Sequence, residues 1–117
     1  MTSILGTLNN PADQMDVIGV GGIDNDDNIA HFSSRGMTTW ELPEGYGRVK
    51  PDIVTYGSFV TGLNLHGGCK PLSGTSVASP VIAGAVALLY SAIAKENRSF
   101  INPASMKQVN FVDRLIC

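Results

Sequence analysis

The sequence has few cysteines, few charged residues and no hydrophobic run long enough to cross a membrane. Its two cysteines, Cys69 and Cys117, give neither a disulfide framework nor a paired metal-ligand spacing, so they leave the redox compartment open. Eight Lys and Arg face ten Asp and Glu, which excludes the positive potential that draws proteins to nucleic acid or anionic membranes. The longest apolar stretch, residues 81–90, is far shorter than the roughly 20 residues of a membrane-spanning helix. We therefore expect no nucleic-acid partner and no membrane segment in this chain.

The composition is that of a folded core. Hydrophobic residues make up 44% of the sequence and charged residues 15%, a balance typical of globular proteins and not of disordered tails. The length of 117 residues limits the chain to one compact domain or part of one. Residues 1–10 lack the basic start and the sustained apolar region of a secretory signal. If the protein is secretory, we expect its targeting information to lie outside this sequence.

The residue pattern predicts several short strands followed by two helices. Strands are expected at residues 17–20, 29–32 and 52–56 and within 58–65, where β-branched or apolar residues are bounded by glycines and turns. From Ser76 the apolar positions cover nearly the whole circumference of a helix that continues to about Ala94. A helix that is apolar all round is expected in a core. Asn102 followed by Pro103 predicts the N-cap and first residue of a second helix.

Ser76 is the most informative residue of the chain. It lies where a turn permitted by Gly74 meets the start of the expected core helix. At such a position unpaired backbone N–H groups and the positive end of the helix dipole can stabilise an oxyanion formed beside the hydroxyl. The plain alternative is that Ser73, Thr75 or Ser76 only caps the helix.

A longer string around Ser76 resembles a known family. The pattern Gly-Thr-Ser-x-Ala-Ser-Pro at residues 74–80, followed by x-x-Ala-Gly-x-x-Ala-Leu through residue 88, resembles the nucleophile segment of subtilisin-like serine proteases. Residues 16–22, 32–36 and 50–53 resemble three further segments of that family in the same order and spacing. The resemblance covers residues 6–108, which we interpret as the C-terminal part of a peptidase domain, and residues 109–117 form a divergent tail.

The resemblance implies a fold and a reaction. The fold is α/β, a partial doubly wound parallel sheet with a buried helix after the nucleophile serine. Ser76 is implied to be the nucleophile, its backbone N–H an oxyanion donor, and the substrate a protein or peptide; no cofactor and no metal is implied. The family's catalytic Asp, catalytic His and oxyanion Asn all precede the part that residue 6 onward resembles. We therefore expect the isolated chain to be inactive.

Four segments resemble a secretory-pathway branch of the family in particular: residues 6–13, 35–42, 52–57 and 102–108. This finer resemblance implies a complete enzyme that cleaves membrane-anchored precursor proteins in the lumen of the endoplasmic reticulum or Golgi.

Local residues are poor substitutes for the missing catalytic groups. His31 and His66 are the only histidines, and neither lies where the family places a triad member. A general base also needs hydrogen-bond reach to the nucleophile and a carboxylate behind it. Asn9 and Asn10 align after the oxyanion asparagine, so we interpret them as turn formers.

Three weaker motifs carry less weight. Residues 24–28 begin like a calcium loop, but Ile29 replaces the required glycine and Arg35 the bidentate glutamate, which favours a solvated turn. The pattern Gly-x-Gly at residues 19–21 lacks the third glycine of a dinucleotide-binding fingerprint. Asn97 begins a glycosylation sequon, which matters only in a secretory lumen.

A hypothesis of a different class stays open beside the protease. The chain could be a catalytically inert truncated product, or the product of an incomplete gene model, acting at most as a binding module. The absent Asp, His and Asn favour inertness for the isolated chain.

Overall fold

The computed structural model describes residues 8–37, 48–100 and 102–108. In chain order the elements are β1 (Val20–Ile23), β2 (Gly36–Met37), β3 (Val49–Lys50), β4 (Ile53–Tyr56), β5 (Val60–Leu63), β6 (Cys69–Leu72), α1 (Thr75–Ala92), the 3₁₀ helix η1 (Lys95–Phe100) and α2 (Pro103–Gln108). Short strands thus precede the helices, as the sequence predicts.

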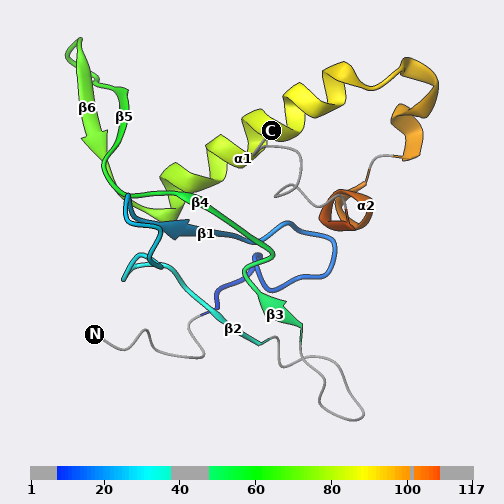
Figure 1. Cartoon of the computed structure of the whole chain (residues 1–117), viewed down its shortest axis with the longest axis horizontal. Helices are drawn as coiled ribbons and strands as arrows, with labels where there is room; N and C mark the ends of the chain where they lie inside the picture. The colour runs from blue at the N-terminus through cyan, green and yellow to red at the C-terminus, as the bar shows by residue number, and fades with distance from the viewer. Residues whose placement is uncertain (1–7, 38–47, 101, 109–117) are drawn as a thin grey trace.

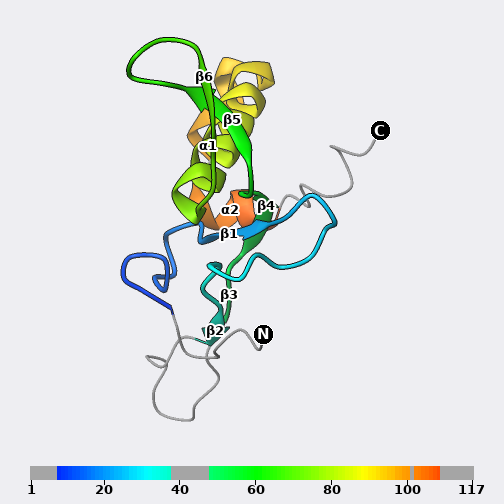
Figure 2. The ribbon, with the colours of Figure 1, turned by 90° about the vertical axis from the view of Figure 1, so that its left-hand side faces the viewer.

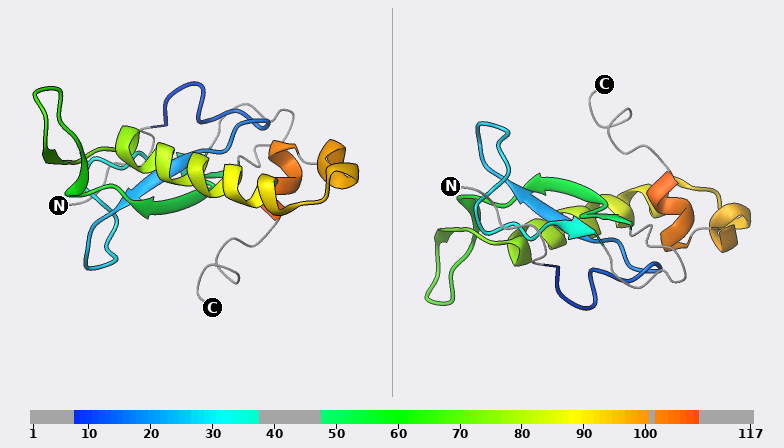
Figure 3. Two further views of the ribbon diagram at one scale, coloured as in Figure 1. Left: turned by 90° about the horizontal axis from the view of Figure 1, so that it is seen from above. Right: turned by 90° about the horizontal axis from the view of Figure 1, so that it is seen from below.

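The elements are stacked in three tiers. The middle tier is a parallel pair, β1 and β4, with Val20 opposite Ile53 and Ile23 opposite Tyr56. Helix α1 crosses one face of this pair and contacts both strands, while β2 and β3, which pair antiparallel, lie on the other side (Figures 1 and 2). The views from above and below show α1 running along the two strands and continuing past them (Figure 3). Parallel strands with a helix on one face confirm the predicted α/β class.

The first strand is displaced from its predicted position. We expected residues 17–20, whereas β1 is Val20–Ile23 and includes both Gly21 and Gly22. These glycines are buried because other segments approach their backbone closely: a Cβ at Gly21 would lie 2.7 Å from the Pro51 ring, and one at Gly22 would lie 3.0 Å from the Phe32 ring. They allow close packing within the strand instead of ending it.

The predicted strand at residues 29–32 is wrong. Only Ile29 forms a bridge, with Ile23, and the chain then turns as Ser33 N–H donates to Ala30 O at 2.9 Å. Predictions for the later elements are confirmed by β4, β5 and α2. The first turn of α2 is capped as expected, since Ser105 N–H donates to Asn102 Oδ1 at 2.9 Å.

Helix α1 differs from the expectation in its burial. It starts where predicted and ends at Ala92, but only Ala78 and Ile82 are buried along it, while Leu88 is 72% exposed. The physical reason is that two parallel strands cover only one side of the helix. By length and composition alone α1 would also suit a membrane span, which is weak evidence because core helices of the same composition are common.

Candidate active site

Ser76 is the second residue of α1, as the sequence predicts, and its side chain is exposed. The preceding Gly74 is the N-cap residue, with φ 154° and no side-chain hydrogen bond capping the helix. The hydroxyls of Ser73, Thr75 and Ser76 are therefore not engaged as caps of α1. Instead Ser76 Oγ lies beside the Gly74 backbone, 3.2 Å from where a Cβ on that glycine would be.

The turn before Ser76 is fixed against the end of β4. Gly74 N–H donates to Gly57 O at 2.8 Å, and Gly57 N–H donates to Ile23 O at 3.0 Å, which joins the turn to β1 through β4. A Cβ at Gly57 would lie 3.1 Å from Gly74 O and 3.4 Å from the Ala78 Cβ. The start of α1 thus packs directly on the backbone of Gly57, which has no side chain. The sequence offered a signal for this contact, a glycine directly after a strand, but its partner was not evident.

The start of α1 has the electrostatics that an oxyanion requires. Val77 and Ala78 donate to Gly74 O at 3.0 and 3.2 Å, so the helical bonds begin with those residues. The N–H of Ser76 precedes them and belongs to the first N–H groups of the helix, which have no intrahelical acceptor. With the positive end of the helix dipole, it provides a donor beside the Ser76 hydroxyl for a negatively charged oxygen.

Among the described residues, no base is hydrogen-bonded to Ser76. Within the part of the chain that the structure describes, no hydrogen bond joins Ser76 to a histidine or a carboxylate. His66 is exposed in the tight turn between β5 and β6, and His31 is exposed in the turn after Ile29, with its ring edge-on to Phe32 at 5.2 Å. Asn9 forms a turn, since Ala12 N–H donates to its carbonyl at 2.9 Å.

A cluster of charges lies beside the start of β4. The Lys50 side chain is fully buried; its Nζ donates to Asp52 Oδ2 at 2.6 Å and to the carbonyls of Gln14 and Val17. Asp52 Oδ2 also accepts the Gly19 N–H at 2.7 Å, and Lys107 from α2 lies 3.3 Å from Oδ1. Burial acts to raise the pKa of Asp52, but the bonds from Lys50 and Gly19 outweigh it and hold that pKa below its usual value.

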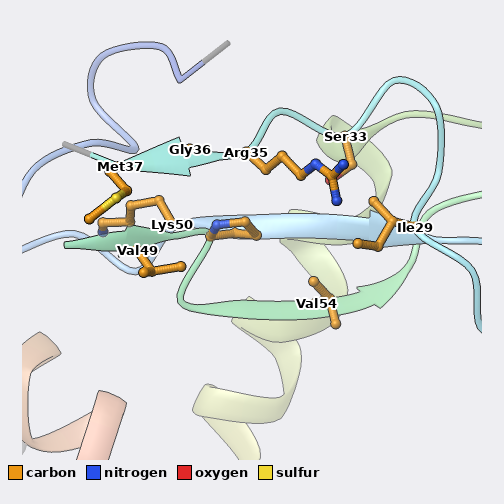
Figure 4. Close-up of a pocket in the computed structure, with 9 residues that line it drawn as sticks. Ile29, Ser33, Arg35, Gly36, Met37, Val49, Lys50 and Val54 are labelled. Atoms are coloured by element: carbon orange, nitrogen blue, oxygen red, sulfur yellow. The ribbon is translucent and has the colours of Figure 1, made fainter. Parts of the chain in front are cut away.

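Two cavities flank this region. One of about 140 Å³ has Asn9, Ala12, Gly19 and Lys50 in its wall together with Thr75, the neighbour of Ser76. The other, of about 520 Å³, lies between the β1–β4 pair and β2–β3, and Figure 4 shows Met37, Val49, Val54 and Ile29 around it. The smaller cavity adjoins the Ser76 turn, whereas α1 lies behind the sheet as seen from the larger one.

The weaker motifs have structural roles or fall outside the description. Asp24 Oδ1 accepts the N–H groups of Asp26 and Asn28, at 3.0 and 2.9 Å, which makes the acidic segment a hydrogen-bonded turn. Cys69 is an exposed free thiol in β6. Cys117 and the predicted tail at residues 109–117 lie outside the described residues.

Comparison with known proteins identifies the class. The subtilase family pattern matches residues 3–111, so this chain belongs to the subtilase family of serine proteases. It is 74% identical over 105 residues to human "Membrane-bound transcription factor site-1 protease" and 70% identical over 106 residues to "Subtilisin-like protease SBT6.1" of Arabidopsis thaliana. Each alignment covers 90% of this chain and 10% of the relative, so the chain spans about a tenth of the length of these relatives.

A solved protease structure agrees with this family assignment. The CspB protease of Clostridium perfringens superposes with a TM-score of 0.76 at 31% identity, covering 92% of this chain and 22% of that protease. The partial subtilisin-like fold predicted from the sequence is thereby confirmed.

Proposed function

We propose that Ser76 is the nucleophile of a subtilisin-like serine endopeptidase whose catalytic His, catalytic Asp and oxyanion Asn come from polypeptide outside this chain. The observation that carries the proposal is the exposed Ser76 at the start of α1, with an N–H beside its hydroxyl and no capping role, in a chain of the subtilase family.

The chemistry follows from this placement. Ser76 Oγ attacks the carbonyl carbon of the scissile peptide bond while the histidine takes its proton. The carbonyl oxygen becomes an oxyanion that accepts hydrogen bonds from the Ser76 N–H and the asparagine side chain. Collapse of this intermediate breaks the C–N bond, the leaving amine takes the proton from the imidazolium, and water then hydrolyses the acyl-serine by the same steps in reverse.

The substrate class follows from the relatives. The name of the human relative describes a protease of membrane-bound transcription factors. We assign to the complete enzyme of this chain the cleavage of membrane-anchored precursor proteins in the Golgi lumen. The small cavity beside Thr75 is in place to receive a side chain of such a substrate next to Ser76.

A chimera tests the proposal. In this chimera, called the site-1 chimera below, residues 6–108 of this chain replace the matching segment of human site-1 protease. We expect it to cleave a membrane-anchored precursor and to lose that activity on Ser76→Ala. Activity that survives Ser76→Ala would refute the assignment, and Ser79→Ala, one turn further along α1, serves as a control for the loss of a hydroxyl.

The second candidate is a catalytically inert product acting at most as a binding module. It is favoured for the isolated chain by the lack of a base bonded to Ser76 among the described residues. Both candidates expect the isolated chain not to hydrolyse peptides, so the site-1 chimera separates them. Cleavage by the chimera that is lost on Ser76→Ala supports the protease, whereas a folded chimera without activity supports the inert product.

A further inference from the structure

Two hydrogen bonds join the corner between β4 and β5 to the turn before Ser76. Gly74 N–H donates to Gly57 O at 2.8 Å, and Phe59 N–H donates to Ser73 Oγ at 2.9 Å. The chain leaves this corner along β5, returns along β6 and reaches Ser73, so the hairpin closes on its own base (Figure 1). The corner thus holds both residues directly before Thr75 and Ser76.

The backbone of this corner is strained at Phe59. Phe59 has φ 54°, in the left-handed region that a bulky side chain rarely adopts, and its side chain is 73% exposed. Burial of the ring does not compensate for such a conformation. The bond to Ser73 Oγ is the described contact that holds the Phe59 amide in place, and strained residues of this kind cluster at functional sites.

The packing around Gly57, on the other side of the corner, leaves no room for a side chain. A Cβ there would meet Gly74 O at 3.1 Å, the Gly22 Cα at 3.3 Å and the Ala78 Cβ at 3.4 Å. Any larger residue would have to push the turn, and with it the start of α1. Gly62 in β5 is different, because a Cβ there would meet only the Leu72 side chain at an ordinary 3.6 Å.

We propose that Ser73 and Gly57 are positioning residues that hold the Ser76 hydroxyl in its attacking geometry through the corner at residues 57–59. The inference rests on the proposed role of Ser76. Neither residue touches the substrate in this role: Ser73 fixes the turn by accepting the Phe59 N–H, and Gly57 fixes it by bonding and packing against Gly74. Small displacements of a reacting group strongly lower the rate of the chemical step without weakening substrate binding.

The test compares hydroxyl variants in the site-1 chimera. Ser73→Ala removes the acceptor for Phe59; Ser73→Thr keeps it; Ser91→Ala removes a hydroxyl that donates to Leu88 O near the other end of α1. We expect Ser73→Ala to lower kcat about tenfold with KM within about twofold, and Ser73→Thr and Ser91→Ala to stay near the parent. A Ser73→Ala kcat equal to that of Ser91→Ala would overturn the role of Ser73.

A pair of glycine variants gives a second test, which does not depend on the Ser73 hydroxyl. Gly57→Ala is expected to lower kcat per titrated active site well below that of Gly62→Ala, whereas equal values would overturn the role of Gly57. Failure of the proposed function is distinguishable, because it appears as activity that survives Ser76→Ala. If Ser76→Ala abolishes cleavage while the Ser73 and Gly57 variants behave as their controls, only the positioning inference fails.

Discussion

At the scale of single residues, the geometry of Ser76 depends on the glycine two positions earlier. Gly74 combines φ 154° with a bond from its N–H to Gly57 O, and its own carbonyl accepts the first two bonds of α1. A side chain at this position would be strained and would also approach Ser76 Oγ at 3.2 Å. Gly74 therefore combines turn formation with an open space for the hydroxyl.

Replacement of Gly74 should impair catalysis beyond its effect on stability. Gly74→Ala forces an L residue into a disfavoured conformation, at a cost of about 1–3 kcal/mol, and displaces Ser76. Gly67→Ala is the matched control, because Gly67 also has a positive φ, 87°, but lies at the hairpin turn with open space around it. In the site-1 chimera, thermal unfolding should show similar destabilisation for both, and kcat should fall only for Gly74→Ala. A normal kcat for Gly74→Ala would contradict this account.

At the scale of elements, the Lys50–Asp52–Lys107 cluster joins β3, the start of β4 and α2. Asp52 accepts from Gly19, at the entrance to β1, while Lys107 of α2 also donates to Met15 O at 2.8 Å. A single carboxylate thus forms ion pairs with two lysines and links segments that are far apart in the sequence.

This cluster predicts a pH dependence of stability. The pKa of Asp52 is lowered on folding, so its contribution is present above the unfolded value of about 3.9 and is lost as the pH falls through the folded value. Asp52→Asn in the site-1 chimera should lower the unfolding temperature at pH 7 and flatten its decline below about pH 4. Asp26→Asn, an exposed carboxylate in the 24–28 turn, is the control, and an Asp52→Asn curve parallel to it would disprove the link.

The elements show which parts of the fold the sequence could predict. Helix α1 and the position of Ser76 were predictable, because a turn glycine, a hydroxyl and a long apolar run lie together in the sequence. The placement of β1 was not, because Gly21 and Gly22 look like strand ends until Pro51 and Phe32 are known to pack on them. The pairing of β2 with β3 joins two-residue segments, which leave no local pattern.

The contacts of the candidate site could not be predicted from the sequence either. The contacts of Gly57 and Ser73 depend on a hairpin that returns to its base, and the sequence pattern did not reveal β6, which includes Pro71 and is exposed along its length. Non-local contacts of this kind need the structure.

At the scale of the whole molecule, much apolar surface is uncovered among the described residues. Leu63, Leu65 and Phe59 on the hairpin are 90%, 98% and 73% exposed, and Leu88 on α1 is 72% exposed. A helix and a parallel sheet of this composition are normally covered on their remaining faces. Exposed apolar patches of such extent drive association.

We therefore predict that the purified 117-residue chain associates and lacks a cooperative thermal transition. Size-exclusion chromatography and differential scanning calorimetry measure the two properties. A clean monomer with a sharp two-state transition would show instead that these residues form a self-sufficient domain.

The most direct test of the central claim is covalent labelling of Ser76 by a fluorophosphonate, located by mass spectrometry. Attack by an activated serine oxygen displaces fluoride and leaves a phosphonyl-serine, whereas a serine without a base reacts slowly. The account predicts rapid labelling at Ser76 in the site-1 chimera, none above background in its Ser76→Ala variant, and none in the isolated chain. Labelling of the chimera at another serine, or of the isolated chain at Ser76 as fast as the chimera, would contradict it.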